Sequence, residues 1–95
     1  MTEKQIEMKL IKETKKQGGL ALKFISPGFV GMPDRILLFP GGGLAFVEVK
    51  APGEKPRALQ LKRHGMLRRL GFKVYVLDDA VQIEQILKDV GGGAK

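Results

Sequence analysis

The chain has 95 residues, a formal net charge of +7, 43% hydrophobic and 28% charged residues, and no cysteine. This length and composition predict one folded globular domain over residues 1–95 and exclude a disordered chain. The lack of cysteine excludes disulfides, thiolate zinc sites and cysteine nucleophiles, and no apolar run approaches the ~20 residues of a membrane span. The positive charge suits a polyanion such as nucleic acid, although many basic proteins bind none.

Helix-forming and strand-forming segments follow one another in the order α-β-β-β-α-β-α. Thr2 and Gln5 have the spacing of a capping box, and two glycines end the first helix. Short connections rich in Gly and Pro join the next three strands, which predicts an antiparallel meander. A helix then crosses over to a fourth strand, which predicts a parallel third and fourth strand in a mixed sheet flanked by helices, an α/β fold. We expect helices at 2–17, at 57–70 and from 78 or 79 to about 90, strands at 19–25, 34–39, 44–50 and 72–77, and a frayed tail at 91–95.

Charged residues interrupt the most apolar stretch of the chain, which forms the second and third strands. Because side chains alternate across a strand, Glu48 and Lys50 share one face of the third strand. If the turn between the strands pairs Leu38 with Leu44, Asp34 falls opposite Glu48. The hairpin would then carry two carboxylates and one ammonium group in a single cluster.

Two adjacent, half-buried carboxylates repel one another unless a proton, a cationic side chain or a metal ion lies between them. One lysine cannot neutralise two acids, so a divalent cation is the natural completion of the cluster. Oxygen ligands suit Mg²⁺ or Mn²⁺. The alternative interpretation is a structural ion-pair cluster, or strand-end charges in water.

The helices add polar residues to the candidate site. Glu7 lies within the apolar stripe of the first helix, so it needs a cationic partner unless it reaches solvent at the edge of the stripe. Gln60 and His64 share a face of the second helix, although either is also an ordinary surface or packing residue in many helices. The apolar positions that the last helix is expected to bury are Val81, Ile83, Ile86, Leu87 and Val90.

The order Gly31-Met32-Pro33-Asp34, then Glu48-Val49-Lys50, then Gln60 resembles the pattern of the PD-(D/E)xK nuclease superfamily. Within this superfamily, the sequence pattern is most similar to that of the VRR-NUC family (virus-type replication-repair nuclease), and the similarity covers nearly the whole chain. The resemblance implies a restriction-endonuclease-like core and a Mg²⁺- or Mn²⁺-dependent endonuclease in the cytoplasm of a bacterium or phage-infected cell. Stand-alone members of this size resemble Holliday-junction resolvases and work as homodimers.

The resemblance also implies roles for individual residues. Lys50 would orient or help deprotonate the attacking water, and Gln60 would orient Lys50 or that water. Some related nucleases have Tyr four residues after the Gln, and the sequence assigns no role to His64, which stands there. The implied metal ligands are Asp34, Glu48, the Val49 carbonyl and, for a second ion or a water bound to the metal, Glu7.

Basic residues at the second helix are expected to contact phosphates without reading sequence, together with lysines of the first helix. No base-reading helix or aromatic platform is evident, so we expect recognition of DNA structure, such as a branch or junction, with steep salt dependence. Phe29 and Val30 would cover the site or pack on a second subunit. The alternatives are a nickase or flap nuclease of the same chemistry, or a non-catalytic nucleic-acid-binding module. The expected DNA contacts are Lys55, Arg57, Lys62 and Arg63.

Overall fold

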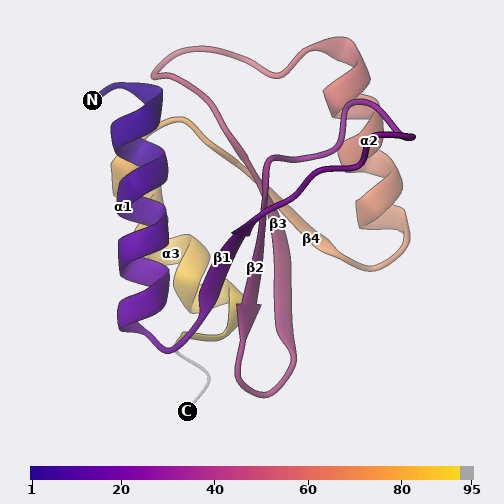
Figure 1. The fold of residues 1–95 in the computed structure, drawn as a ribbon. Coiled ribbons are helices and arrows are strands. Elements are labelled where there is room, and N and C mark those ends of the chain that lie inside the picture. The colour runs from indigo at the N-terminus through magenta and orange to yellow at the C-terminus, as the bar shows by residue number, and fades with distance from the viewer. Residues whose placement is uncertain (93–95) are drawn as a thin grey trace.

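A mixed four-stranded sheet lies at the centre of the molecule, with helices on both of its faces (Figure 1). The structure is a computed structural model that describes residues 1–92. The predicted order of helices and strands is confirmed. The elements are α1 (Glu3–Lys16), β1 (Leu20–Lys23), β2 (Arg35–Phe39), β3 (Gly43–Val49), α2 (Ala58–Arg69), β4 (Lys73–Leu77), a 3₁₀ turn (Ala80–Gln82), α3 (Ile83–Leu87) and a wide final turn (Lys88–Gly92).

The strands lie in the order β1-β2-β3-β4. The pairs β1–β2 and β2–β3 are antiparallel and the pair β3–β4 is parallel, so the predicted meander and crossover are confirmed. The β2–β3 register pairs Leu38 with Leu44, as predicted. Continued to the residue before β2, this register sets Asp34 opposite Glu48.

Helix α1 begins with the predicted capping box. The Thr2 N–H donates to Gln5 Oε1 at 2.8 Å, and the Gln5 N–H donates to Thr2 Oγ1 at 3.1 Å. Ile6 and Leu10 lie four residues apart on one face and are buried. Thr14, one turn further on, is also buried, and its hydroxyl donates to the Leu10 carbonyl at 2.6 Å. The only polar side chain of this buried stripe is therefore satisfied within the helix.

The two faces of the sheet carry cores of different size. Helices α1 and α3 cover one face, the α1–α3 face, where Leu37 and Leu77 are fully buried in the larger apolar cluster (Figure 1). Helix α2 covers part of the opposite face, the α2 face. There Phe46, Leu67 and Val74 form a smaller cluster.

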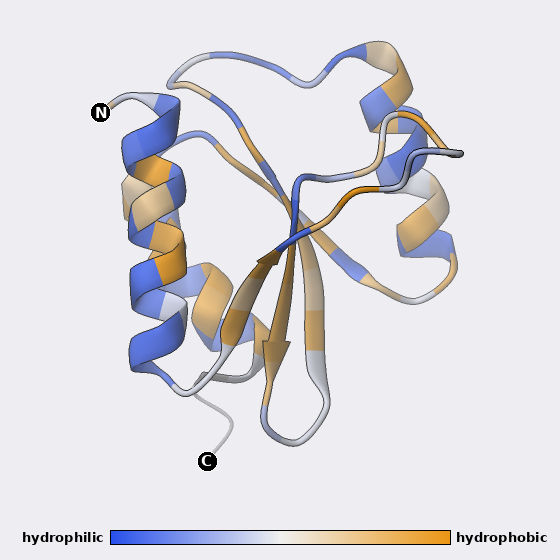
Figure 2. Cartoon of the chain, viewed as in Figure 1, coloured by the Kyte–Doolittle hydropathy of each residue, from blue (hydrophilic) through white to orange (hydrophobic). Residues whose placement is uncertain are grey.

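Part of the α2 face extends beyond α2. Apolar residues run along the β1–β3 strands, as the orange colouring of Figure 2 shows. Leu20 and Leu22 of β1 pair with Leu38 and Ile36 of β2, so all four lie on this face. Leu20 is 56% exposed and Leu22 is 43% exposed. This region is an apolar sheet surface that no described helix covers.

The last helical segment differs from its prediction at Val81, which is 78% exposed rather than buried. The segment opens as a 3₁₀ turn, in which the Asp79 carboxylate accepts a hydrogen bond from the Val81 N–H at 3.0 Å. Three residues per turn shift the face of the helix relative to α-helical periodicity, so Ala80 packs against the core instead. The other four predicted positions are buried: Ile83, Ile86, Leu87 and Val90.

Of the tail predicted for residues 91–95, residues 93–95 lie outside the described residues. Gly91 is not frayed, because a Cβ at this position would lie 3.0 Å from the Cβ of Phe39. The final turn therefore closes against the end of β2. None of the helices within residues 1–92 is both long and apolar enough to cross a membrane.

Candidate active site

The loop before β2 fixes the backbone of Asp34. Gly31 has a φ of +95°, and a Cβ there would lie 2.9 Å from Leu59 Cγ, so the glycine lets the loop approach α2 closely. The Asp34 carbonyl accepts a hydrogen bond from the Phe24 N–H at 2.7 Å. Its Oδ2 atom accepts one from the Val49 N–H at 2.9 Å. The backbone of Asp34 is thus held by the segment after β1, and its carboxylate by the end of β3.

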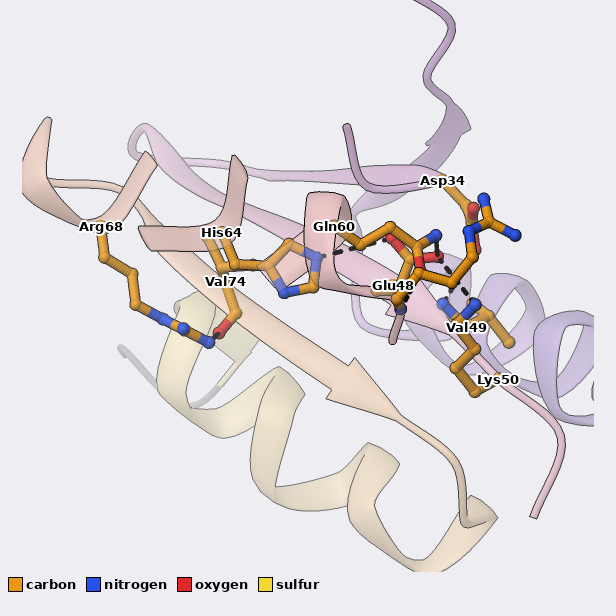
Figure 3. A network of polar contacts seen from close by, with 9 residues as sticks. Asp34, Glu48, Val49, Lys50, Gln60, His64, Arg68 and Val74 are labelled. Atoms are coloured by element: carbon orange, nitrogen blue, oxygen red, sulfur yellow. Dashed lines mark hydrogen bonds and ion pairs between the residues drawn. The ribbon is translucent and has the colours of Figure 1, made fainter. Parts of the chain in front are cut away.

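Glu48 is the central residue of the site and is 1% exposed. It points from β3 to the α2 face, where α2 covers it (Figure 3). Its Oε2 atom accepts a hydrogen bond from Gln60 Nε2 at 3.0 Å and lies 3.9 Å from Lys50 Nζ. Its Oε1 atom lies 3.5 Å from His64 Nε2. The structure therefore brings Glu48, Lys50 and Gln60 together, with His64 as a fourth member.

The two acids share one electrostatic environment. Burial raises the pKa of Glu48 to about 7, and the negative charge of Asp34 and a hydrogen bond between the two carboxyl groups act in the same direction. The positive charges of Lys50 and Arg57 oppose the shift. Glu48 thus holds a proton at pH values where an isolated glutamate is ionised.

Helix α2 orients the glutamate through Gln60. The Gln60 side chain accepts a hydrogen bond from the Arg57 N–H at 2.8 Å, at the start of the helix, and donates one to Glu48. Its predicted partner was Lys50 or the attacking water, and in the structure the partner is Glu48. One turn later, His64 is fully buried. Burial lowers the pKa of His64, and the charge of Arg68 adds to this effect.

Comparisons with known proteins find a relative of similar sequence and a solved structure of similar fold. The chain is 53% identical over 76 residues to "Putative nuclease p44" of Acyrthosiphon pisum secondary endosymbiont phage 1, a match that spans 80% of this chain and 82% of the relative. A solved structure described as a VRR_NUC domain is similar with a TM-score of 0.85 and 29% identity, over 93% of this chain and 97% of that one. No family model matches the sequence.

The chain belongs to the VRR-NUC family. The resemblance seen in the sequence is therefore confirmed, and the chain is a nuclease of the VRR-NUC type. The PD-(D/E)xK elements occupy the expected places in the fold. Asp34 lies before β2, Glu48 and Lys50 lie at the end of β3, and Gln60 lies in the first turns of α2.

Glu7 of this VRR-NUC chain has a partner that the sequence did not reveal. Its Oε2 atom lies 2.9 Å from both Nε and Nη2 of Arg35. Strand alternation gives the missing signal, because Arg35 and Asp34 are consecutive and point to opposite faces of the sheet. Among the described residues, no three Asp, Glu, His or Cys side chains gather as a metal-binding group. Glu7 therefore does not join Asp34 and Glu48 in this structure.

The acid pair nevertheless fits a hard divalent cation. Glu48 Oε1 is buried and has no hydrogen-bond partner within residues 1–92. Burial and the charge of Asp34 raise the pKa of Glu48 although the Lys50 ammonium group opposes the shift. A divalent ion can replace the proton of Glu48, and carboxylate and carbonyl oxygens are the ligands that Mg²⁺ and Mn²⁺ prefer.

The predicted DNA-contacting residues differ in how free their side chains are. Lys55, Arg57 and Lys62 are exposed. Arg63 is half-buried, and its Nε donates to the Val30 carbonyl at 2.8 Å while its guanidinium lies 3.8 Å from the centre of the Phe29 ring. Arg63 thus fastens the loop before β2 to α2, and the loop that carries Phe29 and Val30 lies beside the helix that covers Glu48.

Proposed function

We propose that this VRR-NUC nuclease is a Mg²⁺- or Mn²⁺-dependent endonuclease that hydrolyses phosphodiester bonds of DNA. The observation that carries the proposal is the buried Glu48 carboxylate, which lies opposite Asp34 and 3.9 Å from the Lys50 ammonium group. A purely structural ion pair would match one acid with one base. The surplus acid supports a role in binding a cation.

Asp34, Glu48 and the Val49 carbonyl are the proposed ligands of the ion. When bound there, such an ion lowers the pKa of a water molecule and polarises a phosphate oxygen. The carboxylates of Asp34 and Glu48 lie opposite one another at the end of the hairpin that is away from its turn. Gln60 fixes the plane of the Glu48 carboxylate through a hydrogen bond to Oε2.

Lys50 supplies the positive charge beside the two acids. Its side chain is 14% exposed and its Nζ lies 3.9 Å from Glu48 Oε2. From this place the ammonium group is suited to orient the attacking water and to stabilise negative charge on the phosphate. Glu7 is proposed to serve a second ion or its water, which requires that its carboxylate turn from Arg35 when DNA and metal bind.

The exposed cations beside the site are the proposed phosphate contacts. Lys55 and Arg57 lie in the loop that leads into α2, and Lys62 is an exposed residue of α2 itself. The lysines of α1 lie across the sheet from α2 (Figure 1), so they are less suited to the same DNA segment. Contacts of this kind position a backbone and do not read bases, which supports selection by DNA structure.

A homodimer that acts on branched DNA, as a Holliday-junction resolvase does, is part of the proposal. Cutting two strands needs two sites, and a two-fold dimer supplies them. The exposed apolar surface around Leu20 and Leu22 supports self-association, since apolar surfaces of this kind often mark interfaces. The phage origin of the relative fits action inside a bacterium or a phage-infected cell.

The test is cleavage of labelled four-way junctions, flaps, nicked duplexes and plain duplexes with Mg²⁺, Mn²⁺ or EDTA. We expect metal-dependent cutting of branched DNA that is lost in Asp34→Ala and in Lys50→Ala. Both variants should still bind DNA in Ca²⁺. Lys12→Ala on α1 is the matched control and should cut normally. Cutting by both site variants rejects the catalytic assignment.

The same panel of substrates separates the alternatives. Preference for a flap or nick over a four-way junction would indicate a flap nuclease or a nickase of the same chemistry. Binding without cleavage under every metal condition would indicate a non-catalytic nucleic-acid-binding module. Sedimentation of the free protein measures the proposed dimer separately, so a monomer that cuts DNA would reject only the dimer.

A further inference from the structure

His64 is a buried polar residue that the proposed chemistry does not use. It lies in α2, four residues after Gln60, and both side chains face the β3 strand (Figure 3). Its side chain is fully buried, and neither ring nitrogen has a hydrogen-bond partner within residues 1–92. A buried imidazole without partners costs free energy that an apolar side chain of similar size would not. A hydrogen-bond donor or acceptor that faces the ring would offset this cost.

The atom that faces the ring is also without a partner. Glu48 Oε1 lies 3.5 Å from His64 Nε2, and both atoms are buried. This separation is a few tenths of an ångström beyond a good N–H···O hydrogen bond, and active-site hydrogen bonds often shorten when substrate binds. The two unsatisfied atoms are thus complementary to one another.

The protonation pattern of the ring follows from its surroundings. A neutral imidazole carries its one proton on either Nδ1 or Nε2. When Glu48 is ionised, its carboxylate oxygens only accept hydrogen bonds. The ring can therefore satisfy Glu48 Oε1 only if its proton is on Nε2.

We propose that His64 is a positioning residue that, as the Nε2–H tautomer, donates to Glu48 Oε1 and holds the carboxylate in the plane that binds the metal ion. This inference rests on the proposed function. Gln60 holds Oε2 and His64 holds Oε1, so one face of α2 grips both oxygens of a single glutamate. Two fixed points prevent rotation of the carboxylate away from Asp34, where one point would allow it.

The contact can be tested in the metal-free protein, because His64 is the only histidine in the chain. Long-range ¹H–¹⁵N spectra of the untagged protein at pH 8 would report a single ring, and the ¹⁵N shifts distinguish the two neutral tautomers. We expect the Nε2–H form, with slowed exchange of that proton. The Nδ1–H form would overturn the proposal, whatever the enzyme cleaves.

A matched pair of variants tests the consequence. Gln and Met have nearly the same shape, but only Gln has a donor at the end of the side chain, so His64→Gln and His64→Met differ in the hydrogen bond. We expect His64→Met to weaken Mn²⁺ binding, measured by calorimetry, by about 10-fold or more. It should lower kcat and leave the KM for DNA unchanged. His64→Gln should keep most of the affinity and the activity.

Leu67→Ala, one turn further along α2, is the control for lost packing, since Leu67 is buried in the same layer. It should lower the free energy of unfolding but not the Mn²⁺ affinity of the folded protein. Equal Mn²⁺ affinity of folded His64→Gln and His64→Met overturns the proposal. If neither variant folds, the tautomer of His64 in the wild-type protein tests the proposal by itself. A wild-type protein that neither binds Mn²⁺ nor cuts DNA rejects the proposed function, and the tautomer still tests the contact itself.

Discussion

The two faces of the sheet are built on opposite principles. On the α1–α3 face the buried side chains are apolar, apart from Thr14, whose hydroxyl is satisfied inside its own helix. On the α2 face the buried residues include Glu48, Gln60 and His64. Within residues 1–92, every buried side-chain nitrogen or oxygen that lacks a hydrogen bond belongs to Glu48 or His64.

This difference indicates a division of labour across one sheet. A buried acid and an unsatisfied ring destabilise the folded state, so a small domain can hold them only if other regions supply enough apolar burial. The α1–α3 face supplies it, because its cluster contains residues from both helices and three strands. The α2 face is then free to carry polar groups arranged for chemistry.

The largest expected effect tests the stabilising face. Leu37 is fully buried on the α1–α3 face, so Leu37→Ala should lower the free energy of unfolding by about 2–5 kcal/mol. The folded fraction of the variant should keep its cleavage rate, because Leu37 does not touch the acid cluster. Urea unfolding and single-turnover cleavage at low temperature measure the two quantities. A fall in the single-turnover rate that corresponds to a free-energy change as large as the loss of stability would contradict the division of roles between the two faces.

The second effect has the opposite sign and tests the chemical face. The pKa of Glu48 rises from 4.5 to about 7 on folding, so the folded state binds a proton more tightly than the unfolded state. The stability that this proton contributes is fully present below pH 4.5 and is lost as the pH rises towards 7.

Glu48→Gln removes that loss and should raise the free energy of unfolding at pH 8, without metal, by up to about 3 kcal/mol. The same variant should lose cleavage, because it lacks a ligand. Urea unfolding at pH 4 and pH 8 checks the sign: the advantage of the variant should shrink at the lower pH. A variant that is less stable than the wild type at pH 8 would show that Glu48 supports the fold.

The third effect concerns the metal. Because Glu48 holds a proton below about pH 7, Mn²⁺ that binds at the proposed site must displace it, and affinity should rise by up to about tenfold per pH unit between pH 5 and 7. Above pH 7 the dependence should flatten. Calorimetry in two buffers with different heats of ionisation measures the released proton directly. Affinity that is constant across this range would contradict a protonated Glu48 at the site.

The smallest expected effect concerns Glu7, which lies outside the acid cluster. Its side chain is 30% exposed and paired with Arg35, so Glu7→Gln should change the free energy of unfolding by less than about 1 kcal/mol. If Glu7 serves a second ion as proposed, cleavage should fall by about 10-fold or more. Glu13→Gln on the same helix, equally exposed, is the control. Unchanged cleavage in Glu7→Gln would leave the Arg35 pair as its whole role.

The sequence by itself determined the hairpin and which residues share a face of its second strand. Alternation put Glu48 and Lys50 on one face, and the structure confirmed the Leu38–Leu44 register on which the place of Asp34 opposite Glu48 depended. These are local features, since a strand, a tight turn and a neighbouring strand span few residues. The family resemblance rested on the same stretch of chain.

Only the tertiary structure decided what each polar group contacts. The pairing of Glu7 with Arg35, the choice of Glu48 as the partner of Gln60, and the burial of His64 all depend on where a helix lies against the sheet. Helical periodicity fixes which residues share a face but not the strand residues that the face meets. That choice follows from packing between segments far apart in the chain, which the pattern of any one segment does not contain.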